Sequence, residues 1–151
     1  SLSELETRLG AAFVETQLEL AKQPLVRSLV LLWHDHLDES HTLSQDIPTA
    51  DGSFLHGIMH RREPDYANAK YWFNRIGAHP AYPEIARRAS QLLSDAPALQ
   101  HLVAGGRWDP NAFVDACQRA ATRETSLVPA LQQLQKIEAQ VLLETFCKGA
   151  N

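Results

Sequence analysis

The chain has 151 residues, of which 44% are hydrophobic and 21% are charged, so it is long enough to bury a core and too apolar to be disordered. Its formal net charge of −4 lacks the excess of lysine and arginine typical of nucleic-acid-binding proteins, and we expect no nucleic-acid partner. The longest apolar run, at residues 29–33, is too short to span a bilayer, and no apolar leader opens the chain. We therefore expect no membrane partner and a cytoplasmic location.

Helical periodicity runs along the whole chain, whereas strand signals are nearly absent, and this predicts one all-α domain over residues 1–151. Proline and capping residues mark the helix boundaries, as where Asp109 precedes Pro110 or where Asp65 follows Pro64. The predicted helices, in chain order, span 4–22, 24–36, 38–47, a segment capped by Asp51 or Ser53 and ending near Glu63, 65–76, 83–94, 110–122, and 126–146 with Ser126 as its cap.

The two central helices are separated by Pro64 alone, which predicts a tight antiparallel αα-hairpin. This hairpin resembles the tetratricopeptide pattern, with Gly57 at its conserved glycine and Ala69-x3-Phe73 in its second helix. A fainter copy of the pattern lies 29 residues earlier, over residues 28–40. We therefore expect tetratricopeptide-like antiparallel hairpins with additional C-terminal helices.

Histidines are concentrated in one part of the chain, since six of the seven lie between residues 34 and 79. His56 and His60 are spaced i, i+4, so their imidazoles can share a divalent metal such as zinc. Gly57 stands where zinc proteases of the HExxH type have their catalytic glutamate, so protease chemistry is not expected. A third ligand would come from a nearby imidazole or carboxylate: His34, His36, His41, Glu63 or Asp65.

Two interpretations of His56 and His60 compete. In the tetratricopeptide pattern these positions pack between the paired helices. A helical wheel instead gathers the apolar side chains of residues 54–59 on one face and places both histidines, with Glu63, on the opposite side. We favour the wheel, which predicts a polar environment for the two imidazoles.

A polar stripe, formed by Asn68, Tyr71 and Arg75, follows on the next helix, whose Trp72 and Phe73 fall on the apolar stripe and are expected in the core. Residues 54–90 carry six basic side chains against three acidic ones, which favours an anionic ligand. In one interpretation Arg61 and Arg62 form a fork for a carboxylate or phosphate, and in the other Glu63 and Asp65 pair with these arginines or cap the next helix. The candidate ligand-binding residues are His34, His56, His60, Arg61, Asn68, Tyr71 and Arg75.

Three segments between residues 32 and 80 read LWHDHL (32–37), GSFLHGIMHRREPD (52–65) and NAKYWFNRIGAHP (68–80). In these segments the chain resembles a family of uncharacterised proteins with the signature LWHDHL, HGI-x-HRREPD and NA-x-YWF-x-R-x-G-x-HP. The resemblance covers about a third of the chain, and it implies no activity, cofactor or partner.

The two cysteines, Cys117 and Cys147, lack the CxxC spacing of metal or redox motifs. We interpret them as buried thiols in a reducing compartment, with a disulfide as the alternative.

Three functions are compatible with these observations. The first is a helical-repeat-like module that binds a small anionic molecule or a peptide in a polar groove of histidine, arginine and tyrosine side chains. The second is a metal-assisted enzyme that uses the His56/His60 pair. The third is a structural or oligomerisation protein, such as a homo-oligomer, that presents an exposed apolar patch on its last helix.

Overall fold

The computed structural model describes residues 1–148 and contains helices but no strand within that range, so the all-α prediction is confirmed. No helix among these residues is long and apolar enough to cross a membrane. The α-helices are α1 (Leu2–Thr16), α2 (Gln23–Trp33), α3 (Leu37–Ser44), α4 (Ala50–Arg62), α5 (Tyr66–Phe73), α6 (Tyr82–Leu92), α7 (Pro110–Thr122) and α8 (Val128–Cys147). The 3-10 segments are η1 (Leu20–Lys22), η2 (Leu93–Asp95), η3 (Pro97–Gly106) and η4 (Thr125–Leu127).

Side-chain caps confirm two of the predicted helix starts. The Asp65 carboxylate accepts a hydrogen bond from the backbone N–H of Asn68 at 3.4 Å and caps α5. The Asp109 carboxylate accepts from the backbone N–H of Ala112 at 2.9 Å and caps α7. Both satisfy an N–H group that lacks a partner within its own helix.

Other predicted boundaries were wrong. Thr49, and neither Asp51 nor Ser53, caps α4. Ser126 lies within η4, and α8 begins after it without a side-chain cap. The first helix stops at Thr16 instead of residue 22, and the next residue adopts a left-handed conformation with a φ of 55°. The 3-10 turns over residues 97–106, which are interrupted by non-helical backbone at Val103, Ala104 and Gly105, were not predicted, because a three-residue turn leaves no 3.6-residue pattern in the sequence.

The 29-residue repeat is reproduced by the helix boundaries. Counting 29 residues from Trp33, the end of α2, reaches Arg62, the end of α4. The same step takes the whole of α3 (Leu37–Ser44) onto the whole of α5 (Tyr66–Phe73). Each pair is joined by three residues, and α2 packs on α3 as α4 packs on α5. Residues 23–73 therefore contain two successive helical hairpins with matching loops.

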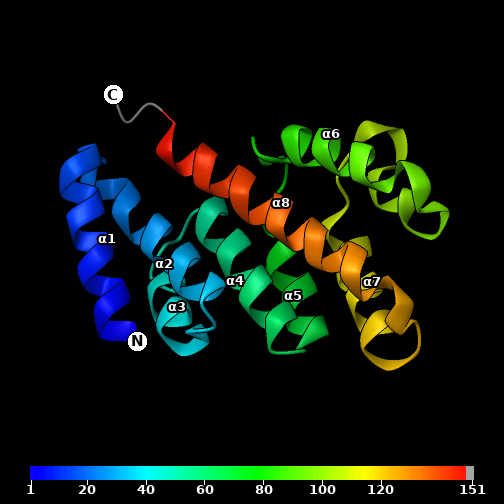
Figure 1. The fold of residues 1–151 in the computed structure, drawn as a ribbon, viewed down its shortest axis with the longest axis horizontal. Coiled ribbons are helices and arrows are strands. Elements are labelled where there is room, and N and C mark those ends of the chain that lie inside the picture. The colour runs from blue at the N-terminus through cyan, green and yellow to red at the C-terminus, as the bar shows by residue number, and fades with distance from the viewer. Residues whose placement is uncertain (149–151) are drawn as a thin grey trace.

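Helix α4 occupies a central position. It packs against α2, α3 and α5, and every residue from 54 to 61 is buried. Figure 1 shows α8 crossing the molecule, with α6 on one side and α4 and α5 on the other. Helix α8 contacts α2, α6 and α7, so it links the two hairpins to the C-terminal helices. Because α4 is enclosed by its neighbours, it has no solvent-exposed face over residues 54–61, the segment that carries His56 and His60.

The contact between α2 and α3 is polar and fully buried. The Ser40 hydroxyl donates to the backbone carbonyl of Ser28 at 2.8 Å, and the two Oγ atoms lie 2.9 Å apart. Both residues have a relative exposure of 0%. Their small side chains allow the helix backbones to approach closely, and each hydroxyl finds a partner on the facing helix.

Both cysteines carry free thiols, but the prediction that both are buried was half wrong, because Cys117 is half-buried and Cys147 is exposed. Burial raises the pKa of both thiols, so neither is activated as a thiolate.

Candidate metal centre

Three imidazoles converge where α3 packs against α4. His41 comes from α3, and His56 and His60 lie one turn apart on α4. One nitrogen from each ring lies within 4.8 Å of the others, and His41 Nε2 is 2.9 Å from His56 Nε2. The sequence offered His41 as one of five potential third ligands, and the packing of α3 selects it.

The rings of this histidine cluster are held by stacking. The His56 ring lies parallel to the Trp72 indole, with 3.9 Å between ring centroids and an interplanar angle of 11°. It also stacks on the His60 ring at 4.8 Å, while His41 meets His56 edge-on at 4.5 Å. Trp72, predicted to lie in the core, is only half-buried and packs against this imidazole, which limits rotation of the His56 ring.

Glu63 fixes the orientation of His60. Its carboxylate Oε1 lies 2.9 Å from His60 Nδ1, while Asp65 Oδ2 lies 4.0 Å from the same nitrogen. A carboxylate accepts hydrogen bonds, so Nδ1 must carry the proton and the Nε2 lone pair stays free. Histidine ligands of zinc are oriented in this way by an acidic partner. Asn68 completes the surroundings, with its Nδ2 atom 3.4 Å from Asp65 Oδ2.

The spacing of the nitrogens suits a tetrahedral ion. Zinc–nitrogen bonds of about 2.0–2.1 Å place two ligand nitrogens roughly 3.3 Å apart. His41 Nε2 and His56 Nε2, at 2.9 Å, would need to separate by only a few tenths of an ångström. The His60 nitrogen, which lies within 4.8 Å of the other two, would need to approach them by up to about 1.5 Å.

His56 is held neutral, which is the form of imidazole that binds metals. Burial lowers the pKa of His56 to about 4, with further lowering by the neighbouring His41 and His60. No proton has to be displaced from this ring at neutral pH when a cation binds.

The same pKa predicts a pH dependence of stability in the metal-free protein. The unfolded chain protonates His56 near pH 6.5 and the folded chain near pH 4, so the unfolded state binds more protons between these values. We expect the contribution of neutral His56 to the free energy of unfolding to be fully present above pH 6.5. As the pH falls towards 4, the free energy of unfolding should decrease by about 1–3 kcal/mol. Urea denaturation across this range measures it.

A His56→Phe variant is the matched control for this prediction, because it keeps a ring against Trp72 but cannot titrate. Subtracting its pH profile from that of the wild type removes the contribution of the carboxylates. Parallel profiles for the two proteins would contradict the assignment of this titration to His56.

The structure corrects the wheel prediction for the two α4 histidines. His56 and His60 are only 4% and 6% exposed, between helices instead of on a polar face. The wheel assumed that α4 has a solvent side, and the helix has none over residues 54–61. For burial, the position expected from the tetratricopeptide pattern was the better guide.

Arg61 is separated from the histidine cluster and is not free to bind a ligand. Its guanidinium is buried against α8, where Nη1 and Nη2 donate to the Glu138 carboxylate at 3.1 and 2.6 Å. The neighbouring Arg62 pairs with Asp35 and reaches the Leu32 carbonyl. Neither of the two arginines pairs with Glu63 or Asp65. Asp65 instead caps α5, which the structural interpretation had allowed.

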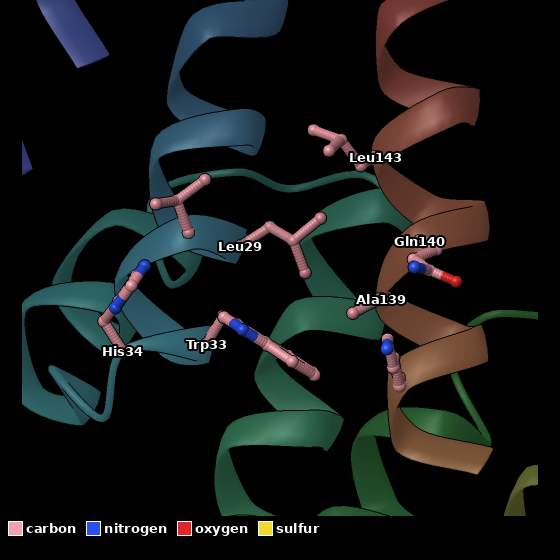
Figure 2. A pocket seen from close by; sticks show the side chains of 8 residues that line it. Leu29, Trp33, His34, Ala139, Gln140 and Leu143 are labelled. Atoms are coloured by element: carbon pink, nitrogen blue, oxygen red, sulfur yellow. The ribbon is translucent and has the colours of Figure 1, made fainter. Parts of the chain in front are cut away.

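His34 also lies apart from the cluster. It is exposed after the end of α2, at the edge of an apolar hollow of about 290 Å³ between α2 and α8. Figure 2 shows Leu29, Trp33 and Ala139 around this hollow, with His34 on the far side of α2.

Tyr71 and Arg75 form an exposed pair beside the cluster. The Arg75 guanidinium lies over the rings of both Tyr71 and Trp72, at 5.5 and 5.4 Å from their centroids, and donates to the Tyr71 hydroxyl at 3.3 Å. Of the predicted site residues, the structure thus brings His56, His60 and Asn68 together and leaves Tyr71 and Arg75 adjacent to them through Trp72.

The chain matches no known family model, no curated protein and no solved structure. The resemblance of residues 32–80 to a family of uncharacterised proteins stays a prediction.

Proposed function

We propose that the protein binds a divalent transition metal, with zinc as the best fit, through His41, His56 and His60. The observation that carries the proposal is the convergence of three nitrogens from two helices within 4.8 Å. Three imidazoles form a ligand set typical of zinc, and the Glu63 carboxylate supplies the outer partner that such sites use.

Three protein ligands leave a fourth position on a tetrahedral ion, and in catalytic sites this position holds water or substrate. Because His56 and His60 are more than nine-tenths buried, we propose water or a small anion as the fourth ligand. An anion bound to the metal ion would combine two hypotheses from the sequence, the metal site at His56 and His60 and the anionic ligand.

We also propose that the hairpins α2–α3 and α4–α5 are diverged tetratricopeptide-like units. The 29-residue correspondence of their boundaries and their equal three-residue loops support a common hairpin plan. Gly57 has the close contact expected at the glycine of such a unit, since an added Cβ would lie 2.9 Å from the Phe73 ring.

The metal proposal is tested by isothermal titration of Zn²⁺ into tag-free, EDTA-treated protein. We expect one ion per chain in the wild type and an affinity at least about 100-fold weaker after His41→Ala or His56→Ala, since each removes a ligand. Glu63→Gln should weaken binding by about 10–100-fold through the loss of the outer partner. The visible absorption of the Co²⁺-substituted protein reports whether the coordination is tetrahedral.

His101→Ala and His34→Ala are the matched controls, since both side chains are exposed and lie outside the cluster. They should leave the stoichiometry and the affinity unchanged. Equal affinities in the wild type, His41→Ala and His56→Ala would contradict the proposal and leave the 2.9 Å contact as a hydrogen bond between the two imidazoles.

A further inference from the structure

Two exposed apolar features lie at opposite ends of α2. The first is the hollow of about 290 Å³ between α2 and α8, and Figure 2 shows Trp33 on its α2 side and Leu143 on its α8 side. None of the three clustered histidines contributes to its lining, so the hollow is separate from the metal centre. The second feature, the 14–20 turn (residues 14–20), precedes α2, and its Val14 and Leu20 are 80% and 82% exposed.

The 14–20 turn is anchored in the core. Gln17 ends α1 in a left-handed conformation, and Phe13 before it and Leu18 after it are both buried in the hydrophobic core. Val14 and Leu20 therefore project from a fixed base. Single exposed apolar side chains are common on soluble proteins, whereas two on one anchored turn indicate a contact surface.

The hollow suits a side chain of a protein partner. Its volume lies at the lower limit of small-molecule sites, which measure about 300–1,000 Å³. Leu29, Val30 and Ala139 extend its apolar wall, and Trp33 is exposed at its edge. Protein interfaces are typically anchored by a few apolar or aromatic side chains that fill such pockets, and tryptophan is enriched among these anchors.

The charges of the two features are complementary. The hollow is lined by Lys136 and by no acidic side chain of the described residues. The 14–20 turn carries Glu15 and Glu19, both exposed, and a single base, Lys22, follows it. Among the described residues, Lys136 and the two glutamates form no ion pair. Opposite charges of this kind select the partner and its orientation across an interface.

We propose that the hollow receives the 14–20 turn of a second copy of this chain, in a two-fold symmetric dimer. Val14 and Leu20 of one copy pack against Trp33 of the other, and an acidic side chain of the turn pairs with Lys136. The turn precedes α2 and the hollow lies along the second half of α2, roughly 10–15 Å away at 1.5 Å per residue. Antiparallel α2 helices therefore bring each turn to the hollow of the other copy, and both contacts form at once, as in other closed dimers.

Sedimentation velocity of the full chain from micromolar to millimolar concentration tests this proposal. We expect dimers to replace monomers as the concentration rises, and the indole N–H NMR signal of Trp33 to shift with the dimer fraction while those of Trp72 and Trp108 stay in place. Leu20→Asp should weaken dimerisation at least about tenfold, because it would bring a charge into an apolar hollow. Leu92→Asp, at an exposed leucine outside the hollow, is the matched control and should leave dimerisation unchanged.

Charge reversal tests the orientation of the two copies. Lys136→Glu alone, and Glu15→Lys combined with Glu19→Lys, should each weaken dimerisation, because like charges then meet at both contacts. An equimolar mixture of these two variants should recover dimers, since each turn meets the opposite charge in the other copy. A chain that stays monomeric at millimolar concentration would overturn the proposal and leave the hollow to a different protein or a small amphipathic molecule. Dimers that Leu20→Asp and both charge reversals leave unchanged would also overturn it, because they form through another face.

Discussion

Replacing Glu138 with alanine should lower the free energy of unfolding by about 3–5 kcal/mol, because it strands the buried charge of Arg61. Both side chains are 1% exposed, and the guanidinium is held by two hydrogen bonds to this one carboxylate. The guanidinium also lies 4.4 Å from the centroid of the Phe113 ring, where water cannot replace the lost carboxylate. Urea denaturation followed by circular dichroism measures the loss.

The double variant Arg61→Met with Glu138→Leu is the control. Removing both charges leaves none to be solvated, and apolar side chains of similar size often restore the stability of a buried pair. We expect the double variant to recover most of the loss. A cost below about 1 kcal/mol for Glu138→Ala alone would show that the pair behaves as a solvated surface bridge.

Gly52→Ala should destabilise the protein by about 2–4 kcal/mol, because the added methyl group would clash with backbone atoms, which cannot rotate away as a flexible side chain can. An added Cβ at this position, in the first turn of α4, would lie 2.0 Å from the carbonyl oxygen of Ile47. The backbone between α3 and α4 would have to move, and this would displace the Thr49 cap.

Gly10→Ala is the matched control for that prediction. Gly10 lies inside α1, and an added Cβ there meets nothing within 4 Å. This substitution should stabilise the protein by about 0.5–1 kcal/mol, because alanine favours helix over glycine. Thermal melts of the two variants should therefore shift in opposite directions. A melting temperature for Gly52→Ala equal to that of the wild type would contradict the close approach of Ile47.

Much of the fold was predictable because the sequence signals of a helix come from residues that are close together in the chain. The apolar period, and caps such as Asp65 and Asp109, depend on residues within a few positions of each other. The 3-10 segment of residues 97–106 was missed because short helical turns are decided by their packing and leave no such period.

The candidate site was only partly predictable, because its partners are distant in sequence. The i, i+4 spacing indicated His56 and His60, but His41 joins them only through the packing of α3 on α4. Arg61 looked like a ligand-binding residue because its carboxylate partner, Glu138, lies 77 residues further along the chain. The helical wheel failed for a related reason, since no local pattern shows that a helix is enclosed on all sides.

The histidine cluster lies between the two helical hairpins. His41 belongs to the first hairpin, and His56 and His60 belong to the second. A 29-residue step from His41 reaches Lys70, so the second hairpin contains no copy of this ligand, and the cluster occurs at the seam between the units. In arrays of helical units, stability depends on the interface between neighbours. An ion bound by these three side chains would link the two hairpins directly, in addition to the packing of α3 on α4.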